Sequence, residues 1–194
     1  MAKLYFRYGA MGSSKTANAL MVRFNYIEKG RSVLMLKSGS DTRDGKDIIS
    51  SRIGLSVECV NAEKYLDDID KMYGKSAEDF SIGYDVIIVD EVQFLSEGYI
   101  EILAYIVDRS QIPVICYGLK TDFTGHLFEG SMRLLELADV IEEIPTICWC
   151  GKKAHFNARV INGSIVKNGK QIMLGGNESY VSLCRKHYMN EQLE

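Results

Sequence analysis

The feature that most constrains this chain is a glycine-rich turn near its N-terminus, between an apolar run at 4–8 and a helical stretch at 16–28. The turn at 9–16 has the sequence GAMGSSKT, which matches the phosphate-loop pattern G-x-x-x-x-G-K-[ST] except for Ser14 in place of the second glycine. A loop that leads from a strand into a helix N-terminus presents unpaired backbone N–H groups to an anion. The sequence therefore predicts an α/β fold with a nucleotide-phosphate site after its first strand.

The residue types of this phosphate loop suit the parts of a nucleotide. Small residues let the backbone approach phosphate oxygens, Lys15 is expected to reach the terminal phosphates, and the Thr16 hydroxyl is expected to coordinate Mg²⁺. A serine- and glycine-rich turn with an ordinary helix cap is the alternative, which Ser14 favours. We expect the whole loop to bind the cofactor: Gly9, Ala10, Met11, Gly12, Ser13, Ser14, Lys15 and Thr16.

Two acidic residues close a second apolar run. Residues 85–89 have the sequence DVIIV and are followed by Asp90 and Glu91. Such a run is typical of a strand buried on both faces of a parallel sheet. Asp90 can hold Mg²⁺ through water, and Glu91 can accept a proton from an attacking hydroxyl. Because a strand followed by acids is common, this interpretation depends on the phosphate loop found with it.

Apolar runs and helical spacing alternate through residues 1–145. The expected strands lie at 32–36, 55–60, 113–118 and 140–144, and the expected helices at 62–73, 97–109 and 132–137. This order predicts a doubly wound, mostly parallel sheet, in which ligands lie at the carboxyl edge. The stretch at 37–51 is expected to be a loop at that edge. In it, Asp41 and Arg43 either meet phosphate and metal or belong to a solvated turn.

Aromatic residues and cysteines divide between core and ligand roles. Phe123 and Phe128, in the expected loop at 119–130, either stack on a base or pack in the core. Cys59 and Cys116 lie in expected strands and are interpreted as small core residues. The lone histidines His126 and His155 are expected on loops or the surface.

The character of the chain changes from residue 146 to 194, which we call the C-terminal lobe. Cys148 and Cys150 form one close pair, and Cys184 and His187 form another, with β-like segments at 154–161 and 164–166 between them. Two such pairs predict a Cys₃His zinc site of zinc-ribbon type; free thiols are the alternative. With no acid nearby in sequence, the zinc is expected to be structural. Gly175 and Gly176 predict a flexible loop between the pairs.

Composition limits the classes of partner. The chain has 194 residues, a formal net charge of −3 and 25% charged residues, which argues against broad binding to nucleic acid or membranes. No apolar run approaches the length of about eighteen residues that indicates a membrane span, and no signal peptide is recognisable. We expect a soluble, cytoplasmic protein.

Six motifs together resemble one family. The phosphate loop is followed, in order, by Asp41-Thr42-Arg43, Asp90-Glu91-x-Gln93-Phe94, Gly118-Leu119-x-x-Asp122-Phe123-x-Gly125, Cys148-x-Cys150-Gly151 and Gly175-Gly176-x-x-x-Tyr180-x-x-Cys184-x-x-His187. This order resembles the type II, cytosolic-type thymidine kinases of the bacterial kind, and the resemblance covers nearly the whole chain. It implies ATP-dependent phosphorylation of the thymidine 5′-hydroxyl to dTMP and ADP, as used in deoxynucleotide salvage for DNA synthesis.

The resemblance also implies roles for individual residues. Glu91 would be the general base. Asp41, Arg43, Asp90 and Gln93 would join the phosphate loop in binding ATP and Mg²⁺, and a lasso-like loop of the C-terminal lobe would cover the base. The implied substrate residues are Phe94, Phe123, Phe128, Gln171, Ile172, Met173, Leu174, Gly175 and Tyr180, and the implied zinc ligands are Cys148, Cys150, Cys184 and His187. The family further implies a homotetramer and feedback inhibition by dTTP.

Two departures and two alternatives accompany this resemblance. Ser14 replaces a glycine, and Thr124 stands where many members have arginine. A kinase for another deoxynucleoside is one alternative, because backbone contacts to the base constrain specificity poorly. The other is a phosphate-loop regulatory or nucleic-acid-binding protein that uses its zinc ribbon as a contact surface. For this second alternative the basic residues are too scattered to form a patch: Arg159, Lys167, Lys170, Arg185 and Lys186.

Overall fold

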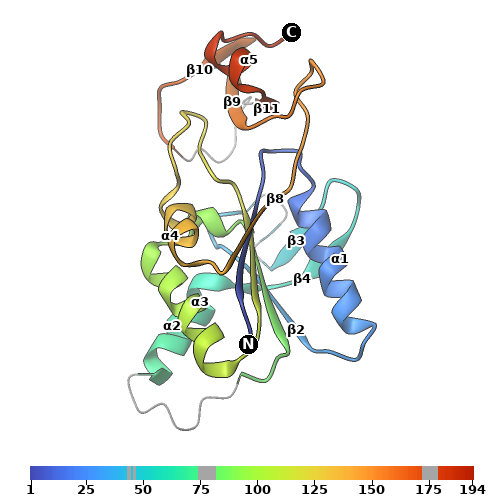
Figure 1. The fold of residues 1–194 in the computed structure, drawn as a ribbon, viewed down its shortest axis with the longest axis vertical. Coiled ribbons are helices and arrows are strands. Elements are labelled where there is room, and N and C mark those ends of the chain that lie inside the picture. The colour runs from blue at the N-terminus through green and yellow to red at the C-terminus, as the bar shows by residue number, and fades with distance from the viewer. Residues whose placement is uncertain (43–44, 46, 74–81, 172–178) are drawn as a thin grey trace.

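A six-stranded, wholly parallel sheet forms the centre of the molecule (Figure 1). The computed structural model describes residues 1–42, 45, 47–73, 82–171 and 179–194. The strand order is β5-β2-β6-β7-β1-β8, and the ranges are β1 Leu4–Tyr8, β2 Val33–Lys37, β5 Val60–Asn61, β6 Val86–Asp90, β7 Val114–Gly118 and β8 Val140–Glu143. The doubly wound sheet expected from the sequence is confirmed.

Helices cover both faces of this sheet. Helix α1 (Lys15–Ile27) lies on one side, and α2 (Ala62–Tyr73), α3 (Glu97–Ser110) and α4 (Glu129–Leu137) lie on the other (Figure 1). Alternate residues of β6 enter the two cores, with Ile87 on the α3 side and Ile88 on the α1 side. Both faces of β6 and β7 are buried, which explains their uninterrupted apolar sequences.

Parallel register brings the functional strand ends to one edge. Lys37 at the end of β2 lies opposite Asp90 at the end of β6, and Tyr8 at the end of β1 lies opposite Gly118 at the end of β7. The phosphate loop follows β1 and Glu91 follows β6, so both leave the sheet at its carboxyl edge.

A small hairpin corrects one sequence expectation. Strand β3 (Ile48–Ser50) pairs with β4 (Ser56–Glu58), so the stretch at 37–51 is not a loop throughout, and the strand expected at 55–60 is divided between β4 and β5. Ile49 is buried beneath the α1 side of the sheet while Ile48 is exposed, the alternation typical of a half-buried strand.

The C-terminal lobe forms an antiparallel sheet of three strands in the order β10-β9-β11. The strands are β9 Phe156–Ile161, β10 Ser164–Val166 and β11 Ser179–Leu183, followed by the short helix α5 (Arg185–Met189). Strands β9 and β10 were expected from the sequence; β11 was not. The lobe has a small core of its own that includes Cys148, Leu183 and Cys184. None of the described helices is long and apolar enough to cross a membrane.

Candidate active site and metal centre

Two glycines of the phosphate loop are required by its backbone. A Cβ added to Gly9 would lie 2.4 Å from the carbonyl oxygen of Ile144, so no side chain fits there. The Gly9 N–H donates to the Gly118 carbonyl oxygen at 3.3 Å, which joins the loop to the neighbouring strand end. Gly12 has a φ of 74°, in the left-handed region that favours glycine.

Ser14 occupies a backbone conformation that explains the glycine of the motif. It precedes α1 as its N-cap with φ 60° and ψ 29°, in the left-handed region. Its carbonyl oxygen accepts the N–H of Asn18 at 2.9 Å, the first turn of the helix. A serine there is strained by roughly 1–2 kcal/mol, but the loop keeps its course into the helix.

The charge of Lys15 lies inside the loop. Its Nζ donates to the carbonyl oxygens of Gly9 and Ala10 at 3.0 Å each, and the side chain is buried. The α1 N-terminus and this ammonium group therefore present positive charge to the same small volume, which is the electrostatic requirement for binding a polyphosphate.

Asp90 is a buried carboxylate directly beside the loop. Burial, followed by the nearby charge of Glu91, raises the pKa of Asp90 to about 7, against the lowering effects of a hydrogen bond with Thr16 and the charge of Lys15. A cation bound beside such a buried acid stabilises its ionised form. The pair formed by Thr16 and Asp90 is thus suited to a cation; that this cation is Mg²⁺ stays a prediction.

Glu91 has a strained backbone conformation, and its side-chain carboxylate has a defined partner. Its φ is 53° and its ψ 37°, unusual for a residue other than glycine and frequent at functional sites. Gln93 Nε2 donates to Glu91 Oε2 at 2.5 Å, while Gln93 Oε1 accepts the N–H of Leu119 at 3.0 Å. Because the second bond fixes the direction of the amide, Gln93 orients the Glu91 carboxylate. The expected contact of Gln93 with the cofactor stays a prediction.

Asp41 is buried rather than part of a solvated turn. Its Oδ2 lies 3.8 Å from the Nζ of Lys37, which is also buried. The same Nζ donates to the carbonyl oxygens of Gly45 and Ile48 at 2.8 Å each, so it anchors the connection after β2 at the sheet edge. Arg43 lies outside the described residues.

The expected substrate aromatics are packed against neighbours. Phe94 and Phe128 contact each other edge to face with ring centroids 5.8 Å apart, and Phe128 is buried. Phe123 is also buried, so for Phe123 and Phe128 core packing accounts for most of the ring surface. A partial contact of the rings with a base stays a prediction.

Arg159 is a residue whose place the sequence analysis missed. Grouped there with scattered basic residues, it is 1% exposed and lies with its guanidinium 3.6 Å from the Phe123 ring centroid. It donates to the Tyr180 hydroxyl at 2.8 Å and to the Lys170 carbonyl oxygen at 3.1 Å. The sequence signal available was its place inside the expected strand at 154–161, between the apolar Ala158 and Val160, in a stretch whose residues 157–160 are all buried.

A second contact holds the start of the expected lasso-like loop. Gln171 Nε2 donates to Asp122 Oδ2 at 2.9 Å, and Asp122 Oδ1 accepts the N–H of Thr124 at 2.8 Å. Gln171 and Tyr180 are thereby brought to the loop that follows β7. The other expected members of this loop, Ile172, Met173, Leu174 and Gly175, lie outside the described residues.

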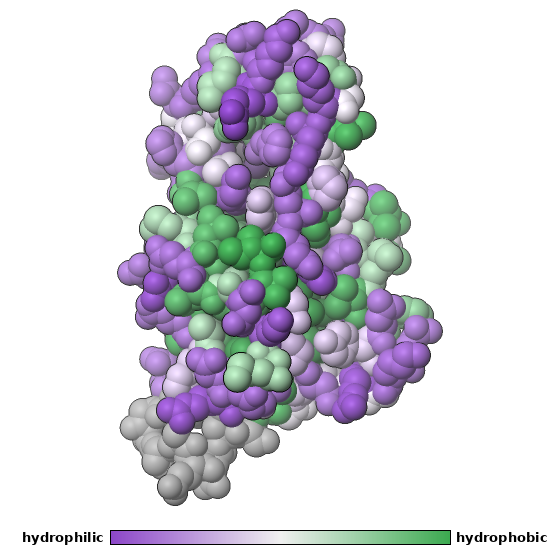
Figure 2. Space-filling model, in the orientation of Figure 1, coloured by the Kyte–Doolittle hydropathy of each residue, from purple (hydrophilic) through white to green (hydrophobic). Residues whose placement is uncertain are grey.

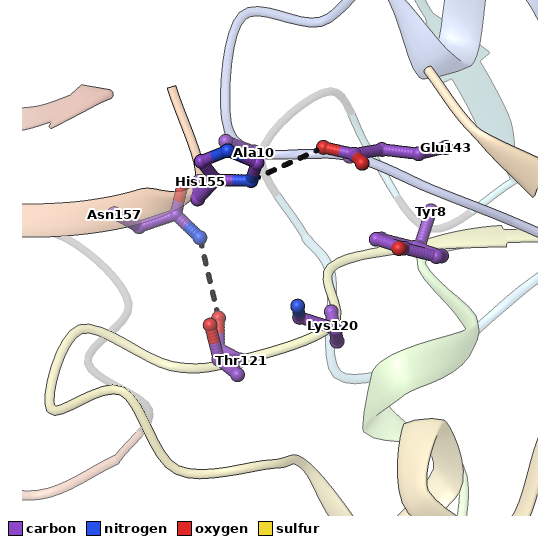
Figure 3. Close-up of a pocket in the computed structure, with 8 residues that line it drawn as sticks. Tyr8, Ala10, Lys120, Thr121, Glu143, His155 and Asn157 are labelled. Atoms are coloured by element: carbon purple, nitrogen blue, oxygen red, sulfur yellow. Dashed lines mark hydrogen bonds and ion pairs between the residues drawn. The ribbon is translucent and has the colours of Figure 1, made fainter. Parts of the chain in front are cut away.

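The C-terminal lobe meets the sheet edge at a small polar pocket beside the phosphate loop (Figure 3). His155 Nδ1 lies 3.5 Å from Glu143 Oε1, and Asn157 Nδ2 donates to the Thr121 carbonyl oxygen at 3.2 Å. In Figure 3, Lys120 and Tyr8 form the opposite wall. His126 and His155 are both exposed, as expected.

Four side chains of the lobe form a ligand cluster. The ligand atoms of Cys148, Cys150, Cys184 and His187 all lie within 4.8 Å of one another. The Cys150 and Cys184 sulfurs are 3.9 Å apart, and His187 Nδ1 lies 3.3 and 3.5 Å from the sulfurs of Cys148 and Cys184. Tetrahedral zinc requires separations of about 3.8 Å between sulfurs and about 3.5 Å between sulfur and nitrogen. The donor set fits zinc.

The electrostatics of the cluster favour a thiolate. Burial opposes ionisation of Cys148, but hydrogen bonds from the backbone of Cys150 and Cys184 and from His187 outweigh it and lower its pKa to about 6. The pKa of Cys150 is raised despite a backbone hydrogen bond at Lys152, because burial and the neighbouring sulfurs of Cys148 and Cys184 disfavour a second charge. A bound cation offsets the repulsion between these negative charges, so all three sulfurs can then be thiolates.

Comparison with known proteins gives a consistent result. The profile of a family described as thymidine kinase matches residues 2–188. A thymidine kinase of Lactococcus lactis subsp. lactis is 44% identical over 194 residues, covering 100% of both chains. A thymidine kinase of Streptococcus pyogenes serotype M3 is also 44% identical over 194 residues, again covering 100% of both. One of Enterococcus faecalis is 45% identical over 191 residues, covering 98% of this chain and 96% of that one.

Proposed function

The chain belongs to the thymidine kinase family, and from that premise we propose that it transfers the γ-phosphoryl group of ATP to the 5′-hydroxyl of thymidine. The observation that carries this proposal is the meeting, at one sheet edge, of the phosphate loop, the buried Asp90 beside Thr16, and the strained Glu91. Together they supply a phosphate cradle, a metal ligand and a base.

The reaction follows from the positions of these groups. The phosphate loop and Lys15 would bind the ATP phosphates, and Thr16 and Asp90 would hold Mg²⁺, which would neutralise charge on the β- and γ-phosphates. Glu91, oriented by Gln93, accepts the proton of the 5′-hydroxyl as its oxygen attacks the γ-phosphorus in line. The bond from the γ-phosphorus to the bridging oxygen breaks, and ADP leaves with that electron pair. Positioning and charge stabilisation carry most of the rate.

The nucleoside is proposed to bind between the β7 loop and the C-terminal lobe. Asp122 and Arg159 fix Gln171 and Tyr180 against this loop. The proposed contacts of the base and sugar are those implied by the family: Phe94, Phe123, Phe128, Gln171, Ile172, Met173, Leu174, Gly175 and Tyr180. Asp41 and Arg43 are proposed to approach the phosphates, and zinc on the Cys₃His cluster is proposed to be structural.

Phosphoryl transfer from labelled ATP tests the proposal directly. With Mg²⁺ present and zinc content recorded, thymidine, deoxyuridine, deoxycytidine and deoxyguanosine are compared as acceptors. We expect transfer mainly to thymidine; a different preferred nucleoside would correct the substrate, and no transfer from a folded, zinc-loaded sample would refute a kinase.

The variant Glu91→Gln tests the base. It removes proton acceptance while keeping the size of the side chain, so we expect turnover to fall by at least about a hundredfold with ATP affinity nearly unchanged. Glu97→Gln, an exposed acid at the start of α3, is the matched control. Near-normal turnover of Glu91→Gln would show that another group takes the proton.

The family expectation of a homotetramer is also a proposal. Helix α1 exposes Met21, Phe24 and Ile27, which suits burial against another copy. Figure 2 shows a further apolar area around α4 and β8, where Met132 and Ile141 are exposed. Light scattering would give the mass in solution. Cytoplasmic location and feedback inhibition by dTTP are proposed on the family alone.

A further inference from the structure

Two side chains of the C-terminal lobe hold the main chain of Met11, in the middle of the phosphate loop. Asn157 Oδ1 accepts the Met11 N–H at 2.7 Å, and the Ser182 hydroxyl donates to the Met11 carbonyl oxygen. The N–H belongs to the peptide group between Ala10 and Met11, and the carbonyl to the one between Met11 and Gly12. The two bonds therefore orient two consecutive peptide planes of the loop.

The two side chains act as one unit because of strand register. Asn157 on β9 and Ser182 on β11 lie directly opposite each other in the antiparallel pair, on the same face of the small sheet. Asn157 is 3% exposed, and its Nδ2 donates to the Thr121 carbonyl oxygen, so its Oδ1 must face Met11. Asn157 cannot turn away from Met11 without also breaking its bond to the Thr121 carbonyl oxygen.

The metal cluster lies close to this pair along the chain. Cys184 follows Ser182 by two residues, directly after β11, and His187 lies on the helix that begins there. A third contact, from the Thr146 hydroxyl to the Gly12 carbonyl oxygen at 3.3 Å, also reaches the loop from the segment before Cys148. The lobe thus packs against the outside of the phosphate loop.

We propose that Asn157 and Ser182 are positioning residues for nucleotide binding: by fixing the Met11 main chain they set the phosphate loop in its binding conformation. The inference rests on the proposed function in one respect, that the loop binds the phosphates of a nucleotide. It adds to that function a role for the C-terminal lobe, which sets ATP affinity through main-chain contacts with the loop.

The test is the dissociation constant of a non-hydrolysable ATP analogue with Mg²⁺, measured calorimetrically without thymidine on the full-length, zinc-loaded protein. Ser182→Ala removes one hydrogen bond, whose net value of about 1 kcal/mol corresponds to about fivefold weaker binding. Ser164→Ala, an exposed serine of β10 in the same small sheet, is the control and should bind within twofold of wild type. Asn157→Ala should weaken binding at least as much as Ser182→Ala.

Melting temperature and zinc content separate positioning from a loss of folding. The inference is supported if Ser182→Ala binds the nucleotide several-fold more weakly while its zinc content and melting temperature match those of Ser164→Ala. It is overturned if Ser182→Ala binds within twofold of wild type, whatever the behaviour of Asn157→Ala. Wild-type protein that binds the analogue but phosphorylates no nucleoside would refute the proposed function alone, and the comparison of variants would still decide the inference.

Discussion

At the scale of single residues, the site is marked by backbone strain. Ser14 and Glu91 both adopt left-handed conformations, and they begin the two helical segments that leave the sheet edge at α1 and at the 3₁₀ turn Val92–Phe94. The position of Ser14 could be predicted from the motif, because the motif has glycine there. The conformation of Glu91 could not, because nothing in a run of acids after a strand specifies φ. Strain at both points is consistent with a backbone shaped by the ligand it binds.

The strain at Ser14 predicts that Ser14→Gly does not destabilise the protein. Glycine removes roughly 1–2 kcal/mol of left-handed strain and costs about 0.5–1 kcal/mol in unfolded-chain entropy. The free energy of unfolding, from denaturant titration, should therefore stay constant or rise by about 1 kcal/mol, with ATP affinity equal or tighter. Ser13, one residue earlier, is not among the residues with positive φ, so Ser13→Gly should lower the free energy of unfolding. Equal losses in both variants would contradict the strain.

The raised pKa of Asp90 predicts a pH-dependent conflict between stability and binding. Its folded pKa of about 7 lies above the usual aspartate value of 3.8, so its contribution to stability is full below about pH 4 and is lost as the pH rises through 7. Asp90→Asn should therefore melt at a higher temperature than the wild type at pH 8 without ligand. The difference should shrink towards pH 5, where the wild-type carboxyl is protonated.

The same variant should lose the benefit of the ligand. Mg²⁺ with an ATP analogue should raise the melting temperature of the wild type at pH 8 and have little effect on Asp90→Asn, because the metal ligand is gone. Asp139→Asn, just before β8, is a control at an exposed acid at the other end of the sheet. An Asp90→Asn protein that melts below the wild type at pH 8 would show that the ionised carboxylate does not destabilise the folded state.

At the scale of elements, the sequence predicted the strands and helices that hydrophobic periodicity and glycine-rich turns indicate. The strands β6 and β7, which are buried on both faces, were predicted nearly to their ends, because a short uninterrupted apolar run indicates a strand in the core of the sheet. The hairpin of β3 and β4 was missed, since strands of three residues give little alternation to detect. Strand β11 was missed because its pairing with β9 crosses many residues of chain. Arg159 was misjudged for the same reason: its partners are set by that pairing.

Arg159 gives the prediction that belongs to this scale. Its guanidinium joins β9 to Tyr180 of β11 and to the backbone at Lys170, while stacking on Phe123. Lysine cannot make this fork of hydrogen bonds. Arg159→Lys should therefore raise KM for thymidine by about tenfold or more, with a smaller change in KM for ATP. Arg185→Lys, an exposed arginine on α5, is the matched control. A larger effect on ATP than on thymidine would place Arg159 with the phosphate loop instead.

At the scale of the whole molecule, the C-terminal lobe and the sheet form one functional body. Contacts cross between them at Met11, Thr121, Phe123 and Glu143. The division of the chain after residue 145 was predicted from the change in its character and stays a prediction. These contacts could not be predicted, because they join residues far apart in sequence. The side of the lobe that carries Asn157 and Ser182 is occupied by the phosphate loop, so that side does not offer the nucleic-acid surface considered as an alternative.

Removing zinc should therefore affect nucleotide binding, although the cluster is not part of the phosphate site. Trp149 is the single tryptophan of the chain and stacks on His187 with ring centroids 4.2 Å apart, so its fluorescence reports on the cluster alone. We expect stepwise chelation to change this fluorescence in proportion to the zinc lost, and to weaken binding of an ATP analogue over the same range. The physical reason is that without the cation the four ligands lose the bonds that hold them together, which loosens the end of β11 beside Ser182. Cys59→Ser, outside the cluster, should retain both zinc and the fluorescence response. Full nucleotide affinity in protein that has lost its zinc and its native Trp149 signal would show that the lobe only covers the phosphate loop and does not hold it.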